Sequence, residues 1–134
     1  MADPTIFPAL RYRDPAAALD FLTNAFGFEE VSVHRSEDGA IQHAELRLGA
    51  GMIMLGPQRG DDWMGGKPPD ALASTLSVYA VVADPDAHHA RARGAGAEVV
   101  RELTDEDYGS REYSARDPEG NLWSFGTYDP YATG

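Results

Sequence analysis

The feature that most constrains the fold of this chain is an internal repeat with a spacing of 69 or 70 residues. Three pairs of markers carry it: Asp14 with Asp84, Gly27 with Gly96, and Gly51 with Gly120. Each aspartate precedes a proline. Such a pair favours a helix start, because the carboxylate accepts from free backbone N–H groups and proline has no N–H to leave unpaired. Because the residues of each pair are 69 or 70 positions apart and serve the same structural purpose, they predict a duplicated unit.

Each copy of this unit is predicted to contain a strand, a helix and three further strands. In the first copy, apolar residues on one face of residues 15–26 indicate a helix that ends at Gly27, followed by the strands FEEVSVH, IQHAELRLG and MIMLG. In the second copy, residues 85–93 indicate a helix, followed by AEVVREL, REYSARD and LWSFGTY. The sequence therefore predicts an α+β fold of two tandem βαβββ modules.

The two modules are expected to form one domain over residues 1–134, since 134 residues are one domain's worth. Module 1 spans about residues 5–57 and module 2 about residues 74–128, with a tail over residues 129–134. Residues 58–73 between the modules lack periodicity and are rich in Gly, Pro and Asp, which predicts a linker. A loop of this length in a compact domain is often functional.

Composition and charge exclude several classes of protein. The chain has no cysteine, which rules out disulfides, thiolate metal sites and a cysteine nucleophile and favours a cytoplasmic location. No signal peptide and no apolar run of about 20 residues is visible, so no membrane partner is expected. A net charge of −11 predicts no nucleic-acid partner. The acidity either serves solubility alone or attracts a cationic ligand, and both interpretations stay open.

The order of the elements, ending in Asp117-Pro118-Glu119-Gly120-Asn121-Leu122-Trp123, resembles the vicinal oxygen chelate superfamily. That superfamily contains glyoxalases, extradiol dioxygenases and bleomycin-resistance-type binding proteins. The resemblance covers about residues 6–128. It implies curved mixed sheets around a cavity with the helices outside, and a homodimer with pockets at or near the subunit interface.

Members of this superfamily that bind a metal carry His or Glu at four strand positions facing the cavity. By resemblance, these positions are Phe7, Met54, Ser77 (or Val78 after a slip of one residue) and Ser124. None of them offers the imidazole or carboxylate donors that a divalent ion prefers. The resemblance therefore predicts no metal here, and we expect no other cofactor.

Strand alternation predicts which side chains line the cavity. Ala44, Leu46 and Leu48 are apolar and are expected to pack under the helix, which turns His43 and Glu45 to the opposite face. The same reasoning assigns to the core Leu10, Tyr12, Ile53, Leu55, Trp123 and Phe125. It assigns to the cavity Phe7, Ala9, Arg11, Arg47, Met52, Met54, Tyr79, Arg116, Leu122 and Ser124. This mixture is typical of a small-molecule site, although Phe7, Met52 and Met54 equally suit a simple core.

Histidines and acidic residues offer a second kind of site. His43 and Glu45 lie two residues apart on one strand, with His34 on its neighbour. They are predicted to contact ligand, to bind a metal or transfer protons, or to form a solvated polar pair, and these alternatives stay open. His88 and His89, on a helix beside two arginines, are predicted to be surface residues.

Two loops are predicted to flank the cavity. Trp63 in the linker is interpreted as a lid or a dimer contact. Tyr108 and Arg111 flank a Gly-Ser pair before a strand and are placed at the pocket mouth, although ordinary hairpin chemistry explains this pair equally well.

We therefore expect a metal-free protein that sequesters an aromatic or cationic small molecule, of the drug- or antibiotic-resistance type. Its predicted ligand-binding residues are Phe7, Arg11, His34, His43, Met52, Met54, Trp63, Tyr79, Tyr108, Arg111 and Ser124. The alternative is a lyase, isomerase or dioxygenase of the same superfamily. It would use His43 and Glu45 as metal ligands or as an acid–base pair.

Overall fold

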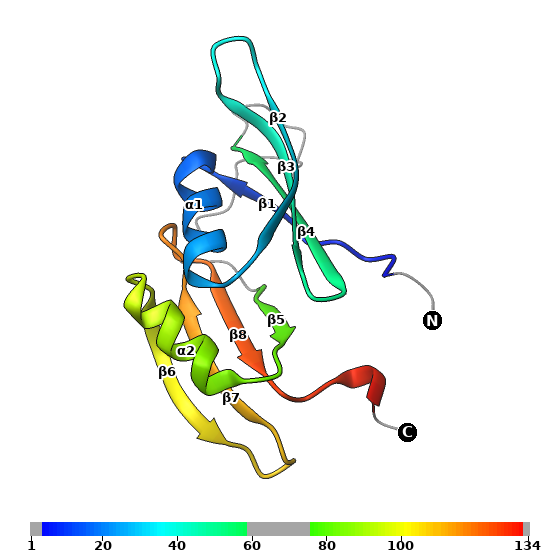
Figure 1. The fold of residues 1–134 in the computed structure, drawn as a ribbon, viewed down its shortest axis with the longest axis vertical. Helices are drawn as coiled ribbons and strands as arrows, with labels where there is room; N and C mark the ends of the chain where they lie inside the picture. The colour runs from blue at the N-terminus through cyan, green and yellow to red at the C-terminus, as the bar shows by residue number, and fades with distance from the viewer. Residues whose placement is uncertain (1–3, 59–75, 133–134) are drawn as a thin grey trace.

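The computed structural model describes residues 4–58 and 76–132. Module 1 contains β1 (Ala9–Tyr12), α1 (Pro15–Ala25), β2 (Glu29–Arg35), β3 (Ile41–Leu48) and β4 (Gly51–Pro57). Module 2 contains β5 (Val78–Val81), α2 (Pro85–Gly94), β6 (Glu98–Asp105), β7 (Arg111–Arg116) and β8 (Leu122–Gly126) (Figure 1). A short 3-10 helix, η2 (Pro130–Ala132), follows β8. The order of elements is the one predicted from the repeat.

Each module forms a four-stranded mixed sheet in which the first strand lies beside the last. The strand orders are β1-β4-β3-β2 and β5-β8-β7-β6. β1 runs parallel to β4, with Ala9 opposite Met54, and β5 runs parallel to β8, with Tyr79 opposite Ser124. The remaining neighbours are antiparallel. The predicted α+β class and the two βαβββ modules are confirmed.

Both helices begin and end as their marker residues predict. The side chains of Asp14 and Asp84 accept hydrogen bonds from the backbone N–H groups of Ala17 (3.0 Å) and Ala87 (3.1 Å). Gly27 and Gly96, which follow the two helices, have φ angles of 82° and 92°. A residue with a Cβ rarely adopts this left-handed conformation, so glycine ends each helix at little cost.

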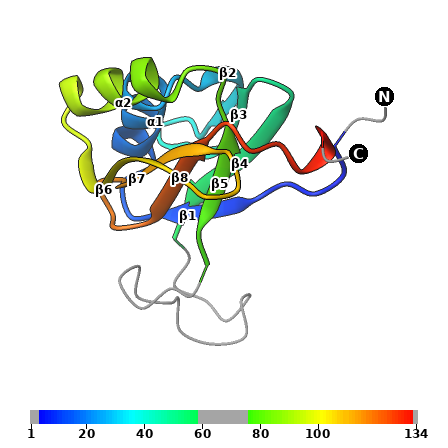
Figure 2. The same ribbon diagram turned by 90° about the horizontal axis from the view of Figure 1, so that it is seen from below.

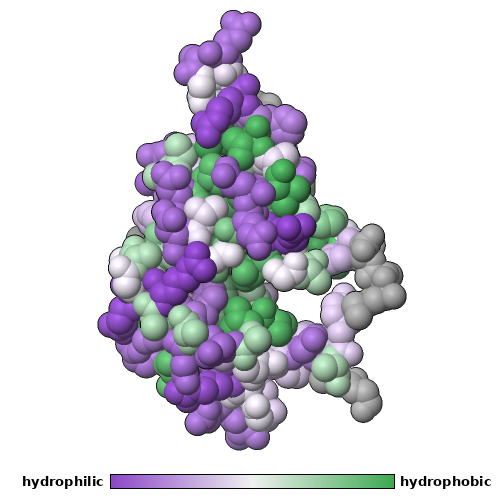
Figure 3. Space-filling model, viewed as in Figure 1, coloured by the Kyte–Doolittle hydropathy of each residue, from purple (hydrophilic) through white to green (hydrophobic). Residues whose placement is uncertain are grey.

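The two helices lie on the same side of the sheets, as Figure 2 shows. The core fills the space between them and the sheets, and Phe26 joins its two halves. The Phe26 ring lies 5.6 Å from the ring of Trp123 and 4.8 Å from that of Phe125, and all three side chains are fully buried. In the view of Figure 3, polar side chains cover most of the surface, and apolar ones are exposed near its middle, around β5.

The turn between β7 and β8 fastens module 2 to the start of α1. Both carboxylate oxygens of Glu119 accept from module 1, one from the backbone N–H of Arg13 (2.7 Å) and the other from that of Asp14 (2.8 Å). Asp117 is buried and accepts from the indole N–H of Trp123 at 3.1 Å. The sequence segment that carries the family resemblance therefore makes contacts between the modules.

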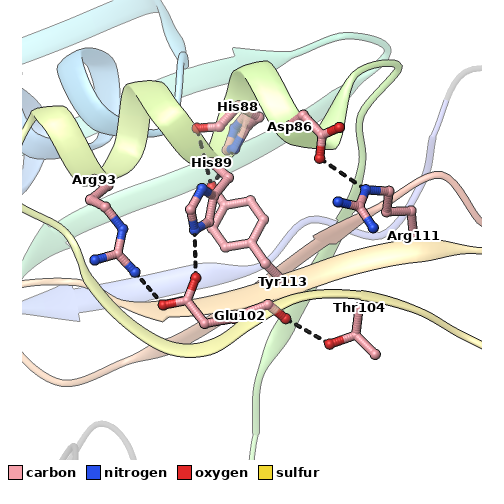
Figure 4. Close-up of polar contacts among 8 residues, drawn as sticks. All are labelled: Asp86, His88, His89, Arg93, Glu102, Thr104, Arg111 and Tyr113. Atoms are coloured by element: carbon pink, nitrogen blue, oxygen red, sulfur yellow. Dashed lines mark hydrogen bonds and ion pairs between the residues drawn. The ribbon is translucent and has the colours of Figure 1, made fainter.

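The prediction that His88 and His89 are surface residues is wrong. The His88 ring is half-buried: its Nε2 donates to the carbonyl oxygen of Phe26 at 2.7 Å, and its Nδ1 bonds to the hydroxyl of Tyr113. The His89 side chain is 15% exposed and its Nε2 lies 2.9 Å from Glu102 (Figure 4). Helical spacing alone did not reveal that α2 packs against both α1 and β7.

No helix in the described ranges has the length and apolar character needed to cross a membrane. Trp63 and most of the predicted linker lie outside the described residues.

Candidate ligand-binding face

The candidate site lies on the faces of the two sheets that are turned away from α1 and α2, here called the open face. Alternation along the strands defines it. On β4, Ile53 and Leu55 are buried under α1, whereas Met52 and Met54 between them remain partly exposed. On β8, Trp123 and Phe125 are buried, and Ser124 points to the other side. The predicted division of these strands into core and open sides agrees with this burial pattern.

The centre of the open face in module 1 combines thioethers with a guanidinium group. The register places Met54 between Ala9 on β1 and Glu45 on β3. Arg11 lies over Gly56, since a Cβ added there would be 2.6 Å from Nη1 of the arginine. Glycine at this position therefore leaves room for the arginine. Phe7 precedes β1 and is 40% exposed.

A polar group occupies the neighbouring strands β2 and β3. Nε2 of His43 lies 3.0 Å from Oε2 of Glu45, and the hydroxyl of Ser32 donates to the other carboxylate oxygen at 3.4 Å. His34 lies opposite His43, with 5.9 Å between the ring centroids. The hydrogen bond from His43 is the main reason that the pKa of Glu45 lies below its usual value. The structure thus brings together the three polar residues that the sequence singled out.

The open face of module 2 is richer in hydroxyl groups. The hydroxyls of Ser124 and Ser114 are 2.7 Å apart and hydrogen-bond to each other. Tyr79 donates its hydroxyl to the backbone carbonyl of Tyr128 at 2.7 Å, and burial is the main reason that the pKa of Tyr79 is raised. These residues present hydroxyl groups and aromatic rings on a sheet.

Sequence reasoning missed Glu112 and Tyr128, which join this face. Oε2 of Glu112 accepts from the hydroxyl of Tyr108 at 2.8 Å, which raises the pKa of Tyr108 to about 12. The rings of Tyr108 and Tyr128 meet edge to face at 5.9 Å. Glu112 precedes the buried Tyr113 on β7, so strand alternation applied to β7 would have placed Glu112 on the open face.

Arg111 is not brought together with the other predicted site residues. Its guanidinium group bonds to Asp86 at the start of α2 (2.9 Å) and to Asp105 at the end of β6 (3.1 Å), as Figure 4 shows in part. Arg111 lies two residues before the buried Tyr113 and therefore on the helix side of β7. Tyr108, which was predicted to lie at the pocket mouth together with Arg111, is on the open face.

The four positions that hold metal in the resembling proteins do not suit a divalent ion here. Phe7, Met54, Ser77 and Ser124 supply a ring, a thioether and two hydroxyls. Among residues 4–58 and 76–132, no group of three or more His, Cys, Asp or Glu is arranged to hold a metal ion. The prediction of a protein without metal stays a prediction, and no reaction step through a metal is derived below.

Comparison with known proteins places this fold in a family. The model of the Glyoxalase/Bleomycin resistance protein/Dioxygenase superfamily matches residues 6–125. An uncharacterized protein of Mycobacterium tuberculosis is 37% identical over 130 residues, which cover 92% of this chain and 74% of that protein. A relative from Mycobacterium bovis has the same identity, over 83% of its length.

Solved structures agree with this assignment. TioX from Micromonospora sp. ML1 is 33% identical with a TM-score of 0.75, over 92% of this chain and 94% of that one. The bleomycin-binding protein of Streptomyces verticillus, complexed with copper(II)-bleomycin, shares the fold with a TM-score of 0.66 and 22% identity, over 96% and 99% of the two chains. The fosfomycin resistance protein FosX of Mesorhizobium loti has a TM-score of 0.65 and 16% identity, over 98% and 97%. The chain therefore belongs to the glyoxalase/bleomycin resistance protein/dioxygenase superfamily, as its resemblance to the vicinal oxygen chelate proteins predicted.

Proposed function

We propose that this protein binds and sequesters an aromatic or cationic small molecule on its open face. The observation that carries the proposal is the chemistry of that face. Apolar and aromatic side chains (Met52, Met54, Tyr79) lie on the same sheet surfaces as two carboxylates, Glu45 and Glu112. Thioethers adapt to irregular ligands, and aromatic rings stack on planar or cationic groups. The net charge of −11 adds an attraction for cations.

A role in resistance to a drug or antibiotic is the form of this function that we favour. One structural neighbour is the bleomycin-binding protein of Streptomyces verticillus, whose structure was solved in complex with copper(II)-bleomycin. Phe7, Met54 and Ser124 carry no imidazole or carboxylate group that would bind a divalent ion. This supports ligand binding without metal catalysis. Fold by itself carries many functions, so the proposal rests on the side chains of the open face.

We also propose that the protein is a homodimer in which a second copy covers part of the open face. Large apolar side chains near both ends of the described chain support this: Ile6 is 87% exposed and Tyr131 is 94% exposed. Both terminal segments extend to the same side of the molecule (Figure 2). Sedimentation velocity checks the proposal, since a monomer at micromolar concentration contradicts it.

A thermal-shift screen against aromatic antibiotics and amine-containing metabolites tests the binding function. A ligand at 100 times its dissociation constant stabilises the folded state by about 2.7 kcal/mol. Met54→Ala should weaken the binding of a ligand found in this way, and Ala90→Ser on the exposed side of α2 should not. Equal affinity of both variants and the original protein would show that the ligand does not contact Met54 on the open face of module 1.

The alternative function is acid–base catalysis by His43 and Glu45, which the 3.0 Å contact between them favours. Their partly exposed side chains are accessible to a substrate on the open face. Mass spectrometry of a ligand incubated with the protein distinguishes the alternatives. Conversion that is lost in Glu45→Gln supports catalysis, whereas recovery of the intact ligand supports sequestration.

A further inference from the structure

Three tyrosines and one carboxylate are linked by contacts on the open face of module 2. Tyr79 comes from β5, Tyr108 from the loop before β7 and Tyr128 from the segment after β8, and Glu112 lies on β7. We call these four residues the tyrosine cluster. Their side chains are accessible, because Tyr79, Tyr108 and Tyr128 are 37%, 57% and 40% exposed. Three separate segments of the chain thus present aromatic surface near one carboxylate.

The cluster is held in place by hydrogen bonds and by the absence of a side chain at Gly126. Tyr108 donates to Glu112 at 2.8 Å, and Tyr79 donates to the backbone of Tyr128 at 2.7 Å. A Cβ at Gly126 would lie 2.4 Å from Cγ of Glu112 and 2.9 Å from the hydroxyl of Tyr79. Glu112 and Tyr79 therefore both rest on β8 above this glycine, and any larger residue there would displace them.

The negative charge of Glu112 is not neutralised by an ion pair within the part of the chain that the structure describes. Arg101 is affected by the charge of Glu112, but the close ion pairs of Arg101 and Arg111 are with other carboxylates. Arg101 pairs with Glu106, and Arg111 pairs with Asp86 and Asp105 on the helix side of the sheet. The interaction that Glu112 does make is with a neutral phenol, since the pKa of Tyr108 is raised to about 12. A carboxylate beside aromatic rings therefore remains available to a cation from outside.

We propose that the tyrosine cluster is the subsite for an alkylammonium group of the ligand. This inference rests on the proposed function. It specifies that the ligand is positively charged and not a neutral aromatic compound. The ammonium group pairs with Glu112, and the electron-rich ring faces of the tyrosines attract its positive charge. A neutral ligand makes neither interaction, so the subsite discriminates by charge.

Calorimetric titration with two probes of similar size tests the subsite. At pH 7 the probe 2-phenylethylamine carries an ammonium group, whereas 2-phenylethanol is neutral. The amine should bind about tenfold more tightly than the alcohol, as expected for one ion pair with cation–π contacts. Glu112→Gln should reduce amine affinity about tenfold and leave alcohol affinity within about twofold, because glutamine keeps the size of the side chain and its acceptor for Tyr108.

Asp107→Asn is the matched control. It removes one negative charge from the same loop as Tyr108, at an exposed residue, and so changes the long-range field similarly. The control should keep the preference for the amine. Equal affinities of the two probes for the original protein, loss of preference in Asp107→Asn, or preference retained in Glu112→Gln would each overturn the subsite.

The outcome also separates this inference from the proposed function. If neutral aromatic compounds bind the open face and the charge of Glu112 has no effect, the subsite is wrong and sequestration stands. If neither probe binds, the subsite is wrong. The binding function fails only if the wider screen also finds no ligand. Unchanged thermal midpoints of Glu112→Gln and Asp107→Asn without ligand would confirm that both variants are folded.

Discussion

The hydroxyl of Tyr12 on β1 donates a 2.6 Å hydrogen bond to Oδ2 of Asp117, which lies just after β7 in the other module. Both residues are buried, and burial is the main reason that the pKa of Tyr12 is raised, so its phenol remains neutral and donates. The Trp123 indole and the Asn121 side chain donate to the same oxygen. A buried carboxylate is tolerated here because several donors surround it.

Tyr12→Phe should therefore destabilise the protein without changing its core packing. The variant removes a hydrogen bond to a charged acceptor, and the free energy of unfolding should fall by about 1–3 kcal/mol. Urea denaturation measures the change. Tyr131→Phe removes a hydroxyl from a residue that is 94% exposed and should have no measurable effect. Equal stability of the two variants would show that the contact between the modules contributes nothing.

His88 should make stability depend on pH. Burial is the main reason that its pKa lies below the ordinary value of about 6.5. The unfolded chain therefore takes up a proton at a higher pH than the folded protein. The stability contributed by neutral His88 is complete above about pH 6.5 and is lost as the pH falls through the folded pKa.

Thermal melts between pH 7 and pH 5 check this expectation. His88→Gln should melt at a lower temperature at pH 7, because it disturbs the contacts to Phe26 and Tyr113. Its midpoint should also change less between the two pH values than that of the original protein. Identical pH profiles for both proteins would assign the acid sensitivity to other groups.

Two glycine-to-alanine variants should change stability in opposite directions. At Gly126 a methyl group would lie 2.4 Å from the side chain of Glu112, and the overpacking should cost about 1–3 kcal/mol. At Gly94, the last residue of α2, a Cβ meets nothing within 4 Å and the backbone has an ordinary φ. Alanine there should stabilise by up to about 1 kcal/mol. Chemical denaturation of both variants checks the predicted signs, and a destabilised Gly94→Ala would contradict this explanation.

The pKa of Glu45 reports on the polar group of module 1. His43→Ala removes the hydrogen bond that lowers this pKa, so it should rise toward the ordinary value of about 4.3. Carbon-detected NMR titration of the carboxyl group measures the change. Ser32→Ala should raise the pKa less, because its contact with Glu45 is longer, at 3.4 Å. An unchanged pKa in His43→Ala would mean that the two side chains do not pair in solution.

The repeated markers predicted most of the fold because each acts over a few residues. Asp14 and Asp84 cap their helices, and Gly27 and Gly96 end them, through contacts within one turn. Alternation along β4 and β8 likewise predicted which side chains are buried, since successive residues of a strand point to opposite faces. The order of elements, the fold class and the separation of the core from the open face follow from such local rules.

Contacts between residues that are far apart in the chain depend on tertiary packing and could not be predicted from the sequence. His88 is on a helix whose sequence is polar, and it became half-buried because α2 packs against the end of α1 and against β7. Arg111 was expected beside Tyr108, but Asp86 and Asp105 hold it on the helix side. Glu112 and Tyr79 lie together over Gly126 only because β5, β7 and β8 are in register. The spacing of residues in the sequence does not predict these side-chain contacts, because they depend on how whole helices and strands pack.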